Sequence, residues 1–360
     1  MAETTGRPVL ATGLFGDLVL PDPVEPGRAA ERQALAAQAA AYAAAARSPA
    51  TLRAYRSAWR QYDAWCRDLG FEPLAGEAGQ VGMYLTRAAE RLAVASLQVH
   101  LAAIVAAHRL AGQQLDPGHP SIALLLDGLR RRKGTAPARQ AAPITPDLLA
   151  RMVRAQPCSP LGLRNRAMLL VGFGAALRRA ELVALDAGDL RFVEGRGVVV
   201  RLRRSKTDPT GAGQEVAIWG AADPDLCAPA ALQAWLAWLQ PARGDQPLFV
   251  GFRPTGVPTG KRLSDKAVVR LIQATAEGIG AADPDLIAGS RGPLAASLAP
   301  RYSGHSLRAG LATAAAEAEA QLHDVMRQTR HKSPEMARRY MRASDLWRNN
   351  VTETVLRKRR

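Results

Sequence analysis

The chain has 360 residues and a mass of 38.4 kDa, a length that predicts two domains. It carries 48 Lys and Arg against 32 Asp and Glu, a formal net charge of +16, and its 48% apolar residues argue against wholesale disorder. The longest apolar run, residues 167–177, is too short to cross a membrane, and the N-terminus lacks the pattern of a cleaved signal peptide. We therefore exclude an integral membrane protein and expect no secretion.

The three cysteines, Cys66, Cys158 and Cys227, lie far apart in the sequence. Their spacing fits neither a disulfide framework nor a cysteine zinc site, so we expect no structural metal. A reducing interior is the natural setting for such a chain. We therefore expect a cytoplasmic location.

Positive charge is concentrated in two parts of the chain. Residues 101–200 hold 14 basic against 7 acidic residues and residues 301–360 hold 13 against 6, whereas residues 1–100 are balanced at 10 and 10. The excess predicts a polyanionic partner, with nucleic acid first. A merely soluble, arginine-rich surface is the alternative. A membrane surface is disfavoured because no helix combines a basic face with bulky apolar anchors.

Residues 1–47 predict a flexible leader that ends in an Ala-rich helix, because prolines and glycines are scattered through its first part. Ser48 and Pro49 then form a helix start, and apolar residues follow at three- and four-residue spacings as far as Cys66. Three more helical segments follow, so residues 48–132 predict a helical bundle. The other face of its first helix carries three candidate phosphate contacts, Arg53, Arg56 and Arg60.

Residues 133–143 combine Gly, Pro, Ala and basic residues without a bulky apolar side chain, which predicts a linker. A second domain over residues 144–342 opens with a helix capped by Thr145. Two β-branched runs, Gly197–Leu202 and Glu215–Trp219, flank a polar loop and predict an antiparallel hairpin with a basic tip. The sequence thus predicts a mainly α fold, a helical bundle plus a mostly helical second domain with a small antiparallel sheet.

Four segments of the second domain carry side chains that suit phosphate binding or proton transfer, the first of them after an apolar helix predicted over residues 163–177. Two segments place an arginine three residues from an acid or a histidine, where both share a helix face. Another is the hairpin tip, and the last places a tyrosine nine residues after a histidine. Each alone has an ordinary interpretation: ion pair, solvated turn, helix cap or packing residue. The candidates are Arg178 and Glu181; Arg203, Arg204 and Lys206; His305 and Arg308; His331 and Tyr340.

In order and spacing, these segments resemble the tyrosine recombinase (phage integrase) family. The stretches GFGAALRRAEL, GHSLRAGLATAAAEA and RHKSPEMARRYMR look like the boxes of that family, and the bundle over 48–132 resembles its SAM-like core-binding domain. The resemblance covers about residues 48–350. Residues 1–47 do not resemble the arm-binding domain of lambda-type integrases. A simple Cre- or Xer-like site-specific recombinase is therefore favoured.

The resemblance implies a mechanism for cleaving and rejoining DNA. Tyr340 would attack a scissile phosphate, form a 3′-phosphotyrosyl bond and release a 5′-hydroxyl. Arg178 and Arg308 would hold the non-bridging oxygens, for which planar guanidinium groups are suited. Lys206 would protonate the leaving oxygen. The phosphotyrosyl bond conserves the energy of the phosphodiester, so no cofactor or metal is expected.

The remaining candidates support that reaction in the resemblance. His305 would accept the proton of the tyrosine or bind the phosphate, and His331 would donate a hydrogen bond to a phosphate oxygen. Glu181 matches the acidic position that supports the site without reacting. The basic residues of the first domain and of the hairpin tip would contact the DNA backbone, the latter as Arg203 and Arg204.

The resemblance also implies partners. The expected substrate is double-stranded DNA with short inverted-repeat sites, bound by a homotetramer in the nucleoid, with an accessory directionality protein as a further partner. Residues 343–360 would form a tail that docks on a neighbouring protomer, and self-packing of that tail is the alternative. Two other functions stay open: a type IB topoisomerase-like DNA relaxase, which the tail disfavours, and a catalytically inert DNA-binding relative, which the complete set of site residues disfavours.

Overall fold

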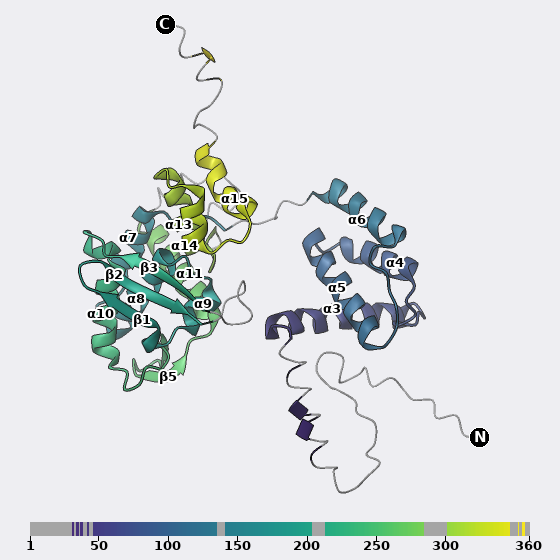
Figure 1. Ribbon diagram of the computed structural model, residues 1–360, viewed down its shortest axis with the longest axis horizontal. Helices are drawn as coiled ribbons and strands as arrows, with labels where there is room; N and C mark the ends of the chain where they lie inside the picture. The colour runs from purple at the N-terminus through teal and green to yellow at the C-terminus, as the bar shows by residue number, and fades with distance from the viewer. Residues whose placement is uncertain are drawn as a thin grey trace. The chain divides into compact units, whose positions relative to one another are not determined.

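A computed structural model describes residues 46–134, 141–203, 213–283 and 301–345, without the side chains of Arg339 and residues 341–345. It also describes nine isolated positions: Glu31, Ala34, Leu35, Ala37, Gln38, Tyr42, Thr352, Val355 and Leu356. The chain divides into two compact units, residues 1–138 and 139–360 (Figure 1), and each is described by itself. Among the described helices, none combines the length and apolar character needed to span a bilayer.

The described part of the first unit is a bundle of four helices (Figure 1): α3 (Pro49–Asp68), α4 (Ala78–Ala89), α5 (Val94–Leu110) and α6 (Pro120–Lys133). The Ser48 hydroxyl accepts the Thr51 N–H and so caps α3, at the start that the sequence predicts. The apolar stripe of α3 is buried at Ala58, Tyr62 and Cys66 against α5. The other three helices correspond to the three further helical segments that the sequence predicts.

The second unit is built mainly from helices, with a small sheet at one side (Figure 1). The first three precede the sheet: α7 (Pro146–Arg154), α8 (Pro160–Gly174) and α9 (Arg179–Ala184). The others follow it: α10 (Ala228–Leu239), α11 (Asp265–Ala282), α13 (Ser306–Glu317), α14 (Leu322–Thr329) and α15 (Pro334–Asp345). The apolar helix α8 packs against α10 on one side and α13 on another, so it forms the centre of the core.

Three antiparallel strands form the sheet in the order β1 (Leu190–Val193), β2 (Gly197–Leu202) and β3 (Gln214–Trp219). The β2–β3 hairpin that the sequence predicts is confirmed, and β2 and β3 bury their alternate side chains towards α10. Strand β1 was not predicted, because its four residues carry no alternating pattern. A second, two-stranded sheet of β4 (Val250–Phe252) and β5 (Pro258–Arg262) was also missed, since four of the five residues of β5 are Pro, Gly or charged.

Helix α8 ends three residues earlier than its apolar pattern predicts. Ala176 adopts a left-handed conformation with φ 47°, and the Leu177 N–H bonds back to the Gly172 carbonyl, which closes the helix. Helix α13 is held against the start of the unit, where the Ile144 N–H donates to the Ser306 carbonyl. A Cβ at Gly310 would lie 2.0 Å from the Ile144 carbonyl oxygen, so only glycine permits this approach. The start of the second unit and the first turns of α13 are therefore held close together.

Candidate active site

Arg178 and Glu181 meet through a helix cap. Arg178 is the N-cap of α9, in an extended conformation, and its backbone N–H donates to Glu181 Oε2 over 2.9 Å. Its guanidinium donates to Glu181 Oε1 over 2.6 Å. The prediction that the two share a helix face is wrong in detail, because Arg178 precedes the helix; the contact itself is present. The cap leaves the Arg178 side chain 22% exposed beside a carboxylate that is 3% exposed.

A second arginine, Arg330, reaches the same carboxylate from the C-cap of α14. Its Nη2 donates to Glu181 Oε2 over 3.0 Å, and the side chain is 5% exposed. Burial raises the pKa of Glu181, but the Arg178 N–H and the charges of both arginines outweigh it, so the pKa is lowered. Glu181 is therefore an anion shared by two cations. The sequence analysis did not select Arg330, since no spacing rule joins it to Glu181.

Arg308 lies in the first turn of α13 and is 1% exposed. Its Nη1 donates to the Ala176 carbonyl over 2.8 Å, while its Nη2 is buried and has no hydrogen-bond partner among the described residues. Burial first, and then the charges of Arg178 and Arg330, lower its pKa to about 10. A buried donor without an acceptor is costly, so this N–H marks a position for an anionic oxygen.

Tyr340, on α15, meets two histidines. Its hydroxyl is 2.5 Å from His305 Nε2, and the His331 ring stacks on the tyrosine ring at 5.5 Å between centroids. His331 Nδ1 is also 2.8 Å from the Thr329 hydroxyl, which fixes the ring. Burial and the nearby Arg308 and Arg178 lower the pKa of both histidines, that of His331 to about 4. Both rings are therefore neutral at pH 7.

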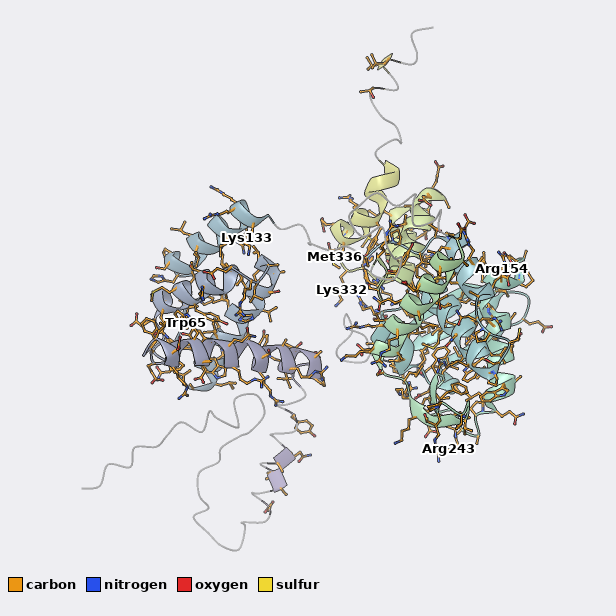
Figure 2. The ribbon with its side chains drawn as sticks, turned by 180° about the vertical axis from the view of Figure 1, so that it is seen from behind. Trp65, Lys133, Arg154, Arg243, Lys332 and Met336 are labelled. Carbon is orange, nitrogen blue, oxygen red and sulfur yellow. The ribbon has the colours of Figure 1, made fainter. Side chains whose placement is uncertain are left out.

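The surface beside this cluster is formed by the segment that joins α14 to α15. Lys332 and Met336 lie at the same edge of the second unit (Figure 2), and both side chains are exposed. By contrast, the neighbouring His331 and Ala337 are buried. Between α14 and α15, His331 is thus turned inward and Lys332 outward, and in the first turn of α15 Met336 is exposed while Ala337 is buried.

Of the basic residues predicted at the hairpin tip, the structure describes only Arg203. Lys206 and Arg204 lie outside the described residues. Arg203 forms ion pairs with Asp186 and with Asp189, the latter 2.6 Å long, and Asp186 also pairs with Arg262. Arg203 therefore anchors the base of the hairpin through two carboxylates, while half of its side chain stays exposed; its contact with DNA remains a prediction.

The basic face predicted for the first unit is present on α3. Arg53, Arg56 and Arg60 are all exposed on this helix. None of them takes part in an ion pair among the described residues, whereas Arg67 on the same helix pairs with Asp63. The three side chains are thus available to an external anion.

Comparison with known proteins shows to which family the chain belongs. Residues 143–346 match the sequence profile described as the phage integrase family. The chain belongs to this family. The integrase/recombinase XerD homologue of Selenomonas ruminantium is 31% identical over 314 residues, which cover 86% of each chain. The recombinase Cre of Escherichia phage P1 is 26% identical over 283 residues, which cover 75% of this chain and 77% of Cre.

Solved structures agree in fold with this recombinase. A lambda integrase fragment in a dimer bound to a COC′ core site gives a TM-score of 0.51 at 18% identity, with 82% of this chain and 89% of that chain covered. XerH bound to palindromic difH gives a TM-score of 0.50 at 14% identity, with 74% and 69% covered. The predictions of a mainly helical fold and of a site-specific tyrosine recombinase are therefore confirmed.

Proposed function

We propose that this recombinase cleaves DNA through Tyr340. The observation that carries the proposal is the pairing of the Tyr340 hydroxyl with His305 Nε2 at 2.5 Å, next to the buried and unsatisfied Nη2 of Arg308. In the proposed step, Tyr340 Oη forms a bond to the scissile phosphorus and the bond to the 5′-oxygen breaks. The products are a 3′-phosphotyrosyl enzyme and a 5′-hydroxyl, and the reverse attack by a 5′-hydroxyl rejoins a strand.

The proton of Tyr340 goes to His305. The lowered pKa of His305 keeps its ring neutral at pH 7, so Nε2 has a lone pair to accept that proton. His331 stacks against the tyrosine ring and holds it in place. The resemblance gives His331 a hydrogen bond to a phosphate oxygen as well.

The negative charge that develops on the phosphate is balanced by the arginines. Arg178 and Arg308 carry the donors, and Glu181 neutralises only part of their charge because it is shared with Arg330. A guanidinium held in advance at the position of the developing charge lowers the barrier without reorganisation. We assign the protonation of the leaving 5′-oxygen to Lys206, which the resemblance alone supports.

We further propose that the enzyme acts on short inverted-repeat DNA in the nucleoid as a homotetramer. The bundle over residues 48–132 would grip the duplex with α3, residues 133–143 would link the domains, and residues 343–360 would dock on a neighbouring protomer. The similarity to Cre and XerH, the latter bound to a palindromic site, supports this arrangement. An accessory protein would set the direction of recombination.

A trapping experiment tests the nucleophile. The binding site is first selected from randomised duplexes with the Tyr340→Phe variant, and the selected duplex is then nicked beside its centre so that cleavage cannot be reversed. We expect the wild-type chain to form a covalent adduct on a denaturing gel, and Tyr340→Phe to bind the duplex but form none. Tyr302→Phe, the same change elsewhere in the second unit, serves as the control. An adduct formed by Tyr340→Phe would disprove the assignment.

A further inference from the structure

The side chain of Arg330 makes more contacts than its position at a helix end requires. Its Nη1 donates to the Ala175 carbonyl over 2.8 Å and its Nη2 to the Ala176 carbonyl over 3.0 Å. The same Nη2 donates to Glu181 Oε2 over 3.0 Å, and the residue is 8% exposed. One guanidinium thus joins the end of α14 to the turn after α8 and to the acid of α9.

These acceptors are shared with both proposed phosphate-binding arginines. The Ala176 carbonyl that accepts from Arg330 also accepts from Arg308 Nη1 over 2.8 Å. The Glu181 carboxylate that accepts from Arg330 also holds Arg178 over 2.6 Å. Arg330 therefore shares one hydrogen-bond acceptor with Arg308 and another with Arg178.

The backbone at Arg330 shows that the side chain is held at a cost. Its φ of 57° and ψ of 42° are left-handed, a conformation that glycine adopts freely and that disfavours a side chain. The next residue is His331, and α15 with Tyr340 begins three residues later. The segment that carries the nucleophile is thus attached to the α8–α9 turn through a strained, buried arginine.

We propose that Arg330 is a positioning residue of the cleavage reaction, which holds Glu181 and the Ala176 carbonyl so that Arg178 and Arg308 face the phosphate bound at Tyr340. The inference rests on the proposed function of Tyr340. Arg330 also shares the charge of Glu181, so the carboxylate does not neutralise Arg178 alone. Three guanidinium groups around one carboxylate leave the cluster two positive charges in excess, which suits a phosphodiester that gains charge as it reacts.

The Arg330→Gly variant tests this role, because glycine keeps the left-handed backbone and removes only the side chain. The assay is single-turnover cleavage of the selected, nicked duplex, with binding of the same duplex measured separately. We expect the cleavage rate to fall about 100-fold, as for a small misplacement of reacting groups, while DNA affinity changes less than about threefold. Millimolar guanidinium should restore part of the rate, whereas neutral urea should not. The cleavage rate of Arg330→Lys should lie between those of the wild type and of Arg330→Gly, since one ammonium cannot reach all three acceptors.

Two controls separate positioning from folding. Arg164 is another buried arginine of the second unit, and it donates to the Val250 carbonyl away from the site. We expect Arg164→Met and Arg330→Met to lower the thermal unfolding midpoint similarly, and only Arg330→Met to slow cleavage. In a Glu181→Gln background, Arg330→Gly should slow cleavage by less than about tenfold, because part of its effect passes through that carboxylate.

Each result decides the matter. Cleavage by Arg330→Gly within about threefold of the wild type would overturn the inference. So would a loss that guanidinium does not relieve, or one matched by Arg164→Met, because either would make Arg330 a purely structural residue. An adduct on Tyr340→Phe would instead overturn the assignment of the nucleophile, so the two failures are distinguishable.

Discussion

Two arginine–carboxylate clusters lie close together in the second unit and differ in charge balance. Around Glu181, one carboxylate faces Arg178 and Arg330, with Arg308 nearby. At the base of the hairpin, Asp186 and Asp189 face two arginines among the described residues, Arg203 and Arg262, so these charges cancel. The first cluster keeps a buried N–H, on Arg308, that finds no acceptor in the described part of the chain.

The difference fits the proposed function, in which the Glu181 cluster binds a phosphate and the Asp186 cluster stabilises the fold. In the balanced cluster every named charge has its partner, and Arg262 uses its other donors on the Val183 and Leu185 carbonyls. In the unbalanced cluster, burial first and then repulsion from Arg178 and Arg330 lower the pKa of Arg308 to about 10. Such an arrangement is unfavourable until an anion arrives, and that is what phosphate transfer requires.

Arg308→Gln should have the largest effect on chemistry. We expect the rate of adduct formation to fall about 100- to 1000-fold, because a preorganised donor to the developing charge is lost. The free energy of unfolding should stay the same or rise, since the change relieves repulsion from Arg178 and Arg330. Single-turnover cleavage and urea unfolding measure the two quantities. A strong loss of stability in this variant would show that Arg308 stabilises the fold, as Arg203 and Arg262 do.

Arg262→Met should lower stability and leave cleavage almost unchanged. It leaves Asp186 short of a partner and removes a donor from the Val183 and Leu185 carbonyls, the latter of which still accepts the Leu248 N–H. We expect the free energy of unfolding to fall by about 2–3 kcal/mol. Cleavage per folded molecule should change less than about threefold. Urea unfolding followed by active-site titration checks both. If cleavage falls as much as in Arg308→Gln, the contrast between the clusters is wrong.

The pH dependence of cleavage should reflect the lowered pKa of His305, to which the excess positive charge contributes. Burial, Arg308 and Arg178 lower its pKa from 6.5, so the neutral form that accepts the Tyr340 proton persists below that pH. We expect a constant single-turnover rate from about pH 8 down to about pH 6.5 and a fall only at lower pH. His305→Gln should lack this acidic limb. A rate already halved above pH 6.5 would contradict the assignment of His305 as the base.

The sequence was sufficient for the elements and motifs that follow local rules. The Ser48 and Thr145 caps are confirmed by their hydroxyl contacts to the following turn, and the hairpin by its strand register. Motif order pointed to the family, which the comparisons confirm. All the catalytic candidates that the structure describes gather in one cluster, and their individual roles stay predictions.

The contacts that the sequence could not give are the long-range ones. Arg330 meets Glu181 across 149 positions, and no periodicity encodes such a pair. Arg203 likewise pairs with Asp186 and Asp189, which belong to an earlier turn, and no local pattern predicts these pairs. Charge in a sequence predicts an anionic partner for the molecule, and only the three-dimensional pairing tells which arginines are left to bind it.

Paired and unpaired arginines also occur together on α3 of the first unit. Changing them should have the smallest expected effect, a change in the salt dependence of DNA binding. Arg53, Arg56 and Arg60 are exposed on α3 without an ion pair among the described residues, while Arg67 is held by Asp63 at 3.0 Å. If the unpaired side chains contact DNA phosphates, each change to Gln should reduce the slope of log affinity against log salt by about 0.9.

Arg67→Gln is the matched control, and it should leave that slope unchanged because its charge is already paired. Filter binding or fluorescence anisotropy between low and moderate salt measures the slopes on the selected duplex and on an unrelated one. Loss on both duplexes is expected, since phosphate contacts carry no base information. If Arg67→Gln lowers the slope as much as Arg56→Gln, ion pairing on this helix does not decide which arginines bind DNA, and the rule drawn from the two clusters fails outside the active site.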